Sequence, residues 1–314
     1  MTTAPAPAVR TTSLSRHYRD VLAVDGLDLT VERGEIYGFL GLNGAGKTTT
    51  IRMLLGMIRP SAGQVALLGT PVRRGGRGPW GRVGYLVDAP APYPGLSVLE
   101  NLRSAARLRG VSDAAVSRAV ERMGLSQYAD RRARSLSQGN RQRLGLAMAL
   151  FHEPELVILD EPANGLDPAG VVEVRDLLRT LAADRGVTIL MSSHILAEVD
   201  RLATRIGIIH RGRLIEELSA EEMERKRALR LVVEARDAAG ARALLKAAGY
   251  EPQPVDGWQA GDGRMVLTQT RAVQRPDEVS AALVAGGHPP TRLAVEQEDL
   301  EEHFLRLTSL EEAS

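Results

Sequence analysis

The chain has 314 residues, of which 44% are hydrophobic and 25% are charged, and its formal net charge is +1. This composition is typical of a soluble globular protein, and the near-neutral charge gives no reason to expect a nucleic-acid partner. The sequence has no cysteine, which excludes disulfides, thiolate metal sites and cysteine nucleophiles. It also has no apolar run of about 18 residues and no apolar segment near its start, so neither a transmembrane helix nor a secretory signal is predicted.

Strands and helices alternate over the first 220 residues, which predicts a mainly parallel α/β sheet. Short strands and turns are expected over residues 18–35. A compact apolar strand at 36–40, a glycine-rich turn at 41–48 and a helix at 49–58 follow. Beyond these, the expected strands are 83–87, 156–159, 188–192, 206–210 and 213–216, and the expected helices are 96–109, 113–123, 136–151, 171–185 and 195–203.

Charge and pattern both change near residue 220. Residues 1–220 hold 28 basic and 22 acidic side chains, a net charge of +6, whereas residues 221–314 hold 12 and 17, a net charge of −5. The second segment is expected to follow the order β-α-β-β-α-β, the ferredoxin-like arrangement, before a final helix. We therefore predict two domains, residues 1–220 and a small α+β domain at 221–314. The elements expected in the second are strands at 230–234, 251–255, 265–270 and 291–295 and helices at 238–248, 277–285 and 299–307.

The segment Gly41-Leu-Asn-Gly-Ala-Gly-Lys47-Thr48 fits the phosphate-binding pattern G-x-x-x-x-G-K-[ST] between an expected strand and an expected helix. Its glycines let backbone N–H groups hold phosphates at a helix N-terminus. Lys47, the sole lysine of the first 220 residues, is expected to reach the β- and γ-phosphates, and the Thr48 hydroxyl to ligate Mg²⁺. The phosphate-loop residues predicted to bind nucleotide are Gly41, Asn43, Gly44, Ala45, Gly46, Lys47, Thr48 and Thr49.

A second motif is the apolar segment 156–159, which ends in two carboxylates, Asp160 and Glu161. Asp160 stands at the end of an expected strand, where it is placed to meet Mg²⁺ through water, and Glu161 can act as general base on an attacking water. Taken alone, the segment fits a buried strand with a solvated acidic turn equally well. Beside a phosphate loop, the catalytic interpretation is favoured.

Together with a third motif, these segments resemble the ATP-binding-cassette (ABC) ATPases over about residues 10–220. The third motif, Leu136-Ser-Gln-Gly-Asn140, is similar to the family signature Leu-Ser-Gly-Gly-Gln and precedes Glu161, as expected in that family. The resemblance implies a P-loop NTPase fold of the ABC type and a homodimer in which Ser137 and Gly139 contact the γ-phosphate bound to the other copy. The plain alternative for Ser137 is a helix N-cap.

Three further residues match positions of this family. His194, after an apolar segment, resembles the switch histidine that contacts the γ-phosphate and holds the water activated by Glu161. Asp167 lies in a segment that resembles the D-loop, which crosses the dimer interface. Tyr18 resembles the aromatic residue that stacks on adenine; a core-facing strand tyrosine is the alternative. The resemblance thus implies Lys47, Glu161 and His194 as the catalytic set.

One position departs from the common pattern. Asp88 aligns with a glutamine that senses Mg²⁺ and contacts the transporter, so the metal set implied is Thr48, Asp88 and Asp160. An acidic residue here resembles the bacterial drug-export and lantibiotic/bacitracin-immunity subgroup. Gln138, in place of the first signature glycine, fits the same subgroup. The alternative for Asp88 is a solvated loop residue.

The resemblance implies the ATPase subunit of an ABC transporter that uses ATP and Mg²⁺ and exports antibiotic-like or lipid-like compounds. Such a subunit works as two cassettes on separately encoded membrane permease subunits, at the cytoplasmic side of the cell membrane. Residues 221–314 would form an accessory or dimerisation domain. Two alternatives are a non-transport ABC ATPase acting on ribosomes or DNA and a non-hydrolysing regulatory clamp. The single cassette and the lack of a coiled-coil insertion disfavour the first, and the presence of Lys47, Glu161 and His194 disfavours the second.

Overall fold

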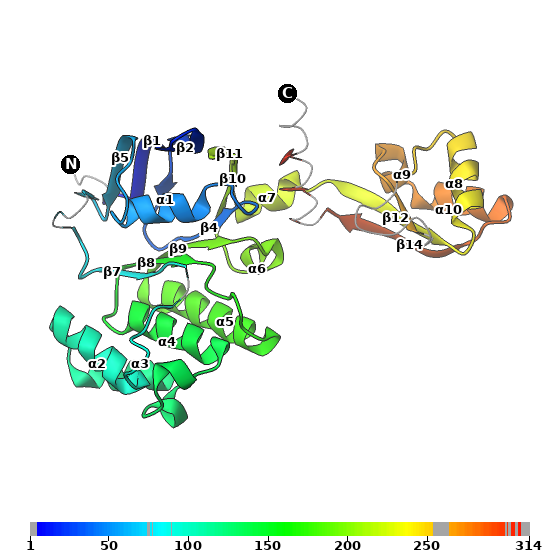
Figure 1. The fold of residues 1–314 in the computed structure, drawn as a ribbon. Helices are drawn as coiled ribbons and strands as arrows, with labels where there is room; N and C mark the ends of the chain where they lie inside the picture. The colour runs from blue at the N-terminus through cyan, green and yellow to red at the C-terminus, as the bar shows by residue number, and fades with distance from the viewer. Residues whose placement is uncertain are drawn as a thin grey trace. The chain divides into compact units, whose positions relative to one another are not determined.

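The structure is a computed structural model, and it describes residues 5–73, 76, 78–88, 90–253, 264–298, 300, 303–304 and 307–308. The chain divides into two compact units, Met1–Glu221 and Glu222–Ser314 (Figure 1). No helix in these described ranges is both long enough and apolar enough to cross a lipid bilayer.

A six-stranded sheet in the order β11-β10-β4-β9-β8-β7 forms the centre of the first unit. Every residue of three adjacent interior strands, β4, β9 and β8, is buried, as expected for parallel strands covered on both faces. Figure 1 shows α1 (Lys47–Leu54) on one side of this sheet, and α4 (Gln138–Leu150) and α5 (Pro168–Arg185) on the other. The strands are β4 (Ile36–Leu40), β7 (Val83–Leu86), β8 (Leu156–Asp160), β9 (Thr188–Ser193) and β10 (Arg205–His210), all parallel, with β11 (Arg213–Ser219) antiparallel at one edge.

Because the five parallel strands run in one direction, their carboxyl ends meet at a single edge of the sheet. The phosphate loop follows β4, Asp160 is the last residue of β8, and His194 comes directly after β9. In open parallel sheets this edge is where ligands bind. The fold therefore brings together three motifs that are far apart in the sequence.

A second, antiparallel sheet covers the outer face of α1 (Lys47–Leu54). Its central strand β1 begins at Val9, whereas the sequence predicted strands only from residue 18. The segment alternates buried Val9 and Thr11 with exposed Arg10 and Thr12, but threonine and serine weaken the apolar signal of that alternation. The strands are β1 (Val9–Tyr18), β2 (Val21–Leu27), β3 (Thr30–Val31), β5 (Ala62–Leu67) and β6 (Thr70–Pro71).

The expected helices of the first unit are present with shifted ends. Side-chain caps fix some of their N-termini: Ser97 and Glu100 form a reciprocal capping box at one helix, and Asp167 caps α5. Short 3₁₀ turns at Ser126–Tyr128 and Ala133–Ser135 precede α4. The helices are α2 (Val98–Arg109), α3 (Asp113–Arg122), α4 (Gln138–Leu150), α5 (Pro168–Arg185) and α6 (Leu196–Asp200).

Replacing Ser97 by alanine is expected to lower the free energy of unfolding by about 1 kcal/mol, because it removes the hydrogen bond that Ser97 Oγ accepts from Glu100 N in the capping box of α2. The matched control is Ser112→Ala. Ser112 stands at the same position before α3 but makes no capping hydrogen bond through its side chain. Urea unfolding of both variants gives the comparison. Equal losses of stability in the two variants would show that the capping hydrogen bond of α2 does not add to the free energy of unfolding.

The second unit begins in α7 (Ala220–Lys226) and is built on an antiparallel sheet in the order β13-β12-β14. Gln253 forms an antiparallel bridge with Val266, which places the second strand, expected at 251–255, beside β13; residues 254 and 255 of that expectation lie outside the described residues. This arrangement is the strand order of a ferredoxin-like fold. The elements are β12 (Leu229–Ala235), α8 (Ala238–Ala247), β13 (Arg264–Leu267), α9 (Thr270–Gln274), α10 (Pro276–Ala285) and β14 (Pro290–Gln297).

The end of one strand in the second unit differs from the sequence-based prediction. The strand expected at 265–270 ends at Leu267, because Thr270 begins the short helix α9. Of the final helix expected at 299–307, residues 300, 303, 304 and 307 are described and are helical, and the other residues of that range lie outside the described part of the chain. The core of the unit comes from one sheet face packed on α8, α9 and α10, including Leu231, Val233 and Leu283.

Candidate active site

The phosphate loop joins β4 to α1, and its glycines are required by backbone geometry. Gly44 and Gly46 have φ angles of 83° and 111°, in the left-handed region that favours glycine. A Cβ atom on Gly41 would lie 2.6 Å from the carbonyl oxygen of Ile209, and one on Gly46 would lie 2.6 Å from that of Ala23. The spacing of the motif therefore follows from close packing of the loop against β10 and β2.

Lys47 lies at the base of this loop with only 6% of its surface exposed. Its Nζ donates to the carbonyl oxygens of Gly41 and Leu42 at 2.6 and 3.3 Å and lies 3.8 Å from Glu161 Oε1. Burial lowers the pKa of Lys47, and the negative charges of Glu161 and Asp160 oppose this shift. The adjoining pocket, of about 170 Å³, is lined by Ala23, Leu42, Asn43, Gly44, Gly46, Lys47, Thr48, Thr49 and Glu161.

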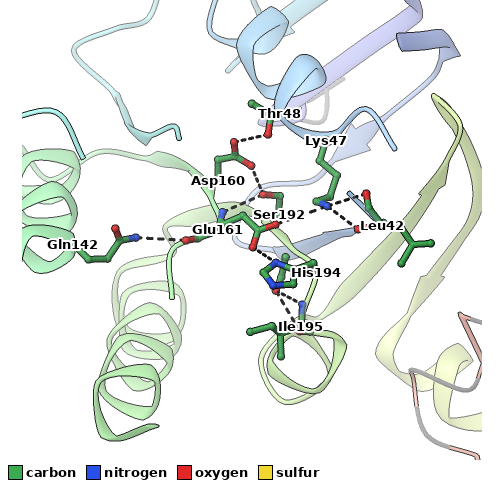
Figure 2. A network of polar contacts seen from close by, with 11 residues as sticks. Leu42, Lys47, Thr48, Gln142, Asp160, Glu161, Ser192, His194 and Ile195 are labelled. Carbon is green, nitrogen blue, oxygen red and sulfur yellow. Dashed lines mark hydrogen bonds and ion pairs between the residues drawn. The ribbon is translucent and has the colours of Figure 1, made fainter. Parts of the chain in front are cut away.

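Asp160 and Thr48 face each other at the carboxyl edge of the sheet. Thr48 Oγ1 donates to Asp160 Oδ2 at 2.8 Å, and Ser192 Oγ donates to Asp160 Oδ1 (Figure 2). Asp160 is 2% exposed, and the two hydroxyl hydrogen bonds compensate for the burial of its charge. The result is a fixed carboxylate with a neighbouring hydroxyl oxygen beside the phosphate loop.

Glu161 is held at its backbone and at its carboxylate. Its φ angle is +52°, which is unusual for a residue with a side chain, and its N–H donates to Ser192 Oγ at 3.1 Å. The carboxylate contacts His194 Nδ1 through Oε2 and faces Lys47 through Oε1. Figure 2 shows this carboxylate between the lysine and the histidine. Nearby Glu198 has a pKa raised by burial, an effect that the His194 ring opposes.

The signature and D-loop residues form a separate cluster in the same chain. Ser137 is the N-cap of α4, where its Oγ accepts a hydrogen bond from Asn140 N at 3.2 Å, so the N-cap interpretation of Ser137 holds in the structure. A Cβ atom on Gly139 would lie 3.5 Å from Leu166 Cδ2. Asp167 caps α5 by accepting from Gly170 N at 3.0 Å. Within the described residues, no hydrogen bond or ion pair joins this cluster to the phosphate loop of its own chain.

Tyr18 and Asp88 each lie beside an arginine. The guanidinium of Arg16 lies 4.4 Å from the centre of the Tyr18 ring, and this tyrosine is 39% exposed rather than core-facing. Asp88, with φ of +57°, accepts a hydrogen bond from Arg52 Nη2 of α1 at 2.7 Å. The pair raises the pKa of Arg52, chiefly through that hydrogen bond. The structure thus joins Asp88 to the phosphate-loop helix rather than to Thr48 or Asp160 directly.

The structure identifies site residues that the sequence did not single out. Ser192 and Gln142 hold the Asp160–Glu161 segment, Ala23 lines the pocket, Arg52 pairs with Asp88, and Glu198 lies near His194. Ser192 and Gln142 stand beside motifs recognised in the sequence, and this position was the one sequence feature that could have pointed to them. Ala23 carries no chemical signal in its sequence context.

The profile of the ABC transporter family matches residues 24–164. The bacitracin transport ATP-binding protein BcrA of Bacillus licheniformis is 36% identical over 300 residues, which cover 95% of this chain and 96% of that protein. The lantibiotic transport ATP-binding protein SrtF of Streptococcus pyogenes is 34% identical over 205 residues, covering 65% of this chain and 88% of that protein.

Solved structures of ATP-binding cassettes have the same fold as the first unit of this chain. The structure of an ATP-binding subunit of an ABC transporter has a TM-score of 0.63 and 29% identity over 70% of this chain and 92% of that one. A dimeric ATP-binding cassette bound to ADP and Pi, 20% identical, has a TM-score of 0.62 over 68% of this chain and 98% of that one. The predicted family and cassette fold are confirmed: this chain belongs to the ABC transporter family and is one of its ATP-binding, ATP-hydrolysing subunits.

Proposed function

We propose that this chain powers the export of antibiotic-like peptides of the bacitracin and lantibiotic type. The relatives named above, which are transport ATP-binding proteins for those compounds, support this choice of substrate. One observation of the structure carries the hydrolytic part of the proposal: the Glu161 carboxylate lies between the Lys47 ammonium and the His194 ring at the edge of the phosphate loop. A base, a cation and a histidine in this arrangement suit attack of water on a γ-phosphate.

Binding begins at the loop between β4 and α1. Backbone N–H groups of the loop and the N-terminus of α1 face the phosphates, and the helix dipole favours their charge. Lys47 exchanges its hydrogen bonds with the Gly41 and Leu42 carbonyls for the β- and γ-phosphate oxygens. The exposed face of the Tyr18 ring stacks on adenine, while Arg16 lies against the same aromatic group.

Hydrolysis follows when a water lies in line with the γ-phosphorus. Glu161 accepts a proton from this water as its oxygen bonds to phosphorus and the bond to the bridging β–γ oxygen breaks, leaving ADP and phosphate. His194 keeps the carboxylate and the water in place through its contact with Glu161. Lys47 stabilises the charge that spreads over the phosphate oxygens.

The residues present also fit a magnesium ion. Thr48 offers a hydroxyl oxygen and Asp160 a fixed carboxylate beside it, which are the hard oxygen donors that Mg²⁺ binds. Thr48 and Asp160 would hold the ion, and Asp88 would join them when its loop moves inward. When bound, Mg²⁺ neutralises charge on the β- and γ-phosphates.

The proposed assembly is a homodimer on a separate membrane permease, at the cytoplasmic side of the membrane. Ser137 and Gly139 of each copy would complete the ATP site of the other, because in one chain they lie apart from its phosphate loop. ATP would close the dimer and hydrolysis would open it. Glu222–Ser314, a compact unit of its own, would serve as the accessory or dimerisation domain.

The transport function is testable in the native cell. Deleting the gene should increase sensitivity to bacitracin or to a lantibiotic such as nisin, and wild-type protein should restore resistance while Glu161→Gln should not. Phosphate release by the purified chain with MgATP is measured in parallel. Unchanged sensitivity to both compounds in the deletion strain would reject the proposed substrate class, and restoration by Glu161→Gln would reject hydrolysis as its power source.

Asp88→Ala is expected to reduce transport by about tenfold while lowering the ATPase rate of the isolated chain only modestly, because Asp88 acts in coupling to the permease. Its bond to Arg52 ties the loop after β7 to the phosphate-loop helix. Both side chains are partly exposed, at 41% and 50%, so the pair breaks and re-forms easily. Drug transport is measured with the chain assembled on its permease, and phosphate release is measured on the isolated chain.

The control for Asp88 is Asp176→Ala, which removes another exposed carboxylate paired with an arginine, Arg179 on α5. This variant should transport at the wild-type rate. Arg52→Ala should share the transport defect of Asp88→Ala, since either change breaks the same pair. Wild-type transport by Asp88→Ala would leave Asp88 as an ordinary loop residue.

A further inference from the structure

A buried glutamine of α4 contacts the backbone that carries Glu161. The Gln142 side chain is 4% exposed, and its Nε2 donates to the carbonyl oxygen of Pro162 at 2.8 Å and lies 3.4 Å from that of Glu161. Figure 2 shows the amide directed from α4 toward this backbone. The reaction proposed above gives Gln142 no chemical step of its own.

The Glu161 backbone needs support from both sides. Its left-handed conformation, with φ of +52°, is one that a residue with a side chain holds only when its surroundings fix it. On one side, Ser192 Oγ accepts a hydrogen bond from the N–H of Glu161 at 3.1 Å. On the other side Pro162 has no N–H, and the carbonyl groups of Glu161 and Pro162 face the amide of Gln142. Ser192 and Gln142 together therefore hold the backbone from which the Glu161 side chain extends.

The helix that carries Gln142 also carries the signature. Ser137 caps α4, and Gly139 in its first turn packs against Leu166. The amide of Gln138 lies against Gly165, where a Cβ atom would come within 2.2 Å of Nε2. The N-terminal part of α4 thus contacts both ends of the segment from Glu161 to Leu166. A shift of α4 would therefore act on the base and on the D-loop of the same chain together.

We propose that Gln142 is a positioning residue that links the two ATP sites of the dimer. When the Ser137 end of α4 docks on nucleotide held by the second copy, Gln142 sets the geometry of Glu161 in its own site. Hydrolysis at one site then depends on occupancy of the other. This inference rests on the proposed function, because it needs two copies that share ATP.

The test replaces Gln142 by methionine, which has a similar length but no N–H donor. The kcat for ATP should fall by roughly tenfold to a hundredfold, the loss expected when a catalytic group is displaced by about 1 Å. The KM and the affinity for a non-hydrolysable ATP analogue should stay within about twofold of the wild-type values. Cooperativity in ATP should also decrease. Gln142→Glu, which keeps the shape of the side chain but not its N–H donor, should behave in the same way. The control is Gln127→Met, which changes an exposed glutamine.

A double variant separates positioning from a general structural role. In a Glu161→Gln background, Gln142→Met should cause no further loss of turnover, because no base remains to be positioned. An additional loss of the same size there would overturn the proposal, and so would unfolding of both Gln142 variants, since the residue would then serve the fold. If Glu161→Gln itself turns over ATP normally, the proposed function fails. If Glu161→Gln loses turnover but the Gln142 variants turn over ATP normally, the proposed function stands and only the inference about Gln142 fails.

Discussion

Glu161→Gln is expected to abolish most ATP turnover while leaving ATP binding intact. The amide keeps the size of the side chain but accepts no proton from water, and loss of a general base costs about 10²- to 10⁴-fold in rate. Lys47, Thr48 and the loop glycines, which bind the phosphates, are untouched. With hydrolysis blocked, the closed dimer should accumulate in ATP. Phosphate release and equilibrium binding of labelled ATP measure the two effects separately.

The control for this variant is Glu198→Gln, which changes a neighbouring carboxylate of α6 whose burial raises its pKa. Its effect on turnover should be small, because Glu198 lies near His194 without facing Lys47. Turnover by Glu161→Gln at the wild-type rate would contradict the assignment of the base. Equal losses in both variants would show that local charge matters more than the position of one carboxylate.

Lys47→Ala and Lys47→Arg are both expected to reduce turnover by about 10²- to 10³-fold, the loss typical when one donor to a charged transition state is removed. Alanine removes the ammonium. Arginine keeps a charge, but its planar guanidinium is too large for a position that is 6% exposed and 2.6 Å from the Gly41 carbonyl. Nucleotide affinity should fall with both changes. Titration with a fluorescent ATP analogue measures the nucleotide affinity, and phosphate release measures the turnover.

Lys246→Arg provides the matched control, since Lys246 is an exposed residue at the end of α8 in the second unit. It should bind and hydrolyse ATP like the wild type. Near-normal turnover by Lys47→Arg would contradict the argument that a compact ammonium is needed in a chain that otherwise uses arginine for positive charge.

The cassette and its chemistry were largely predictable from the sequence, because each catalytic motif is local. The Gly41–Thr48 segment needs glycine where its backbone is left-handed or closely packed, and the positions of these glycines can be read directly from the sequence. Asp160 ends one fully buried strand and His194 directly follows another, so parallel pairing brings them to one edge. The comparisons confirm the predicted ABC family and its likeness to bacitracin and lantibiotic transport proteins.

Contacts between segments could not be predicted in the same way. Gln142 and Ser192 support Glu161 across 19 and 31 residues of chain, and their role depends on how α4 and β9 pack. The pairing of Asp88 with Arg52 likewise depends on the approach of the loop after β7 to α1. Strand β1 was missed before residue 18 because its buried face includes Thr11, whose hydroxyl donates to Leu27 O at 2.8 Å.

The proposal that two copies share ATP is tested most directly by disulfide crosslinking, because the chain has no cysteine of its own. Leu42→Cys in one copy and Ser137→Cys in another, both with Glu161→Gln, place single thiols on the phosphate loop and the signature. With ATP, mild oxidation should give a linked dimer containing one chain of each kind, since a disulfide requires the two Cα atoms to lie within about 7 Å. Without nucleotide the yield should be low. Absence of this dimer in ATP, or an equal yield without nucleotide, would contradict a site built from both copies.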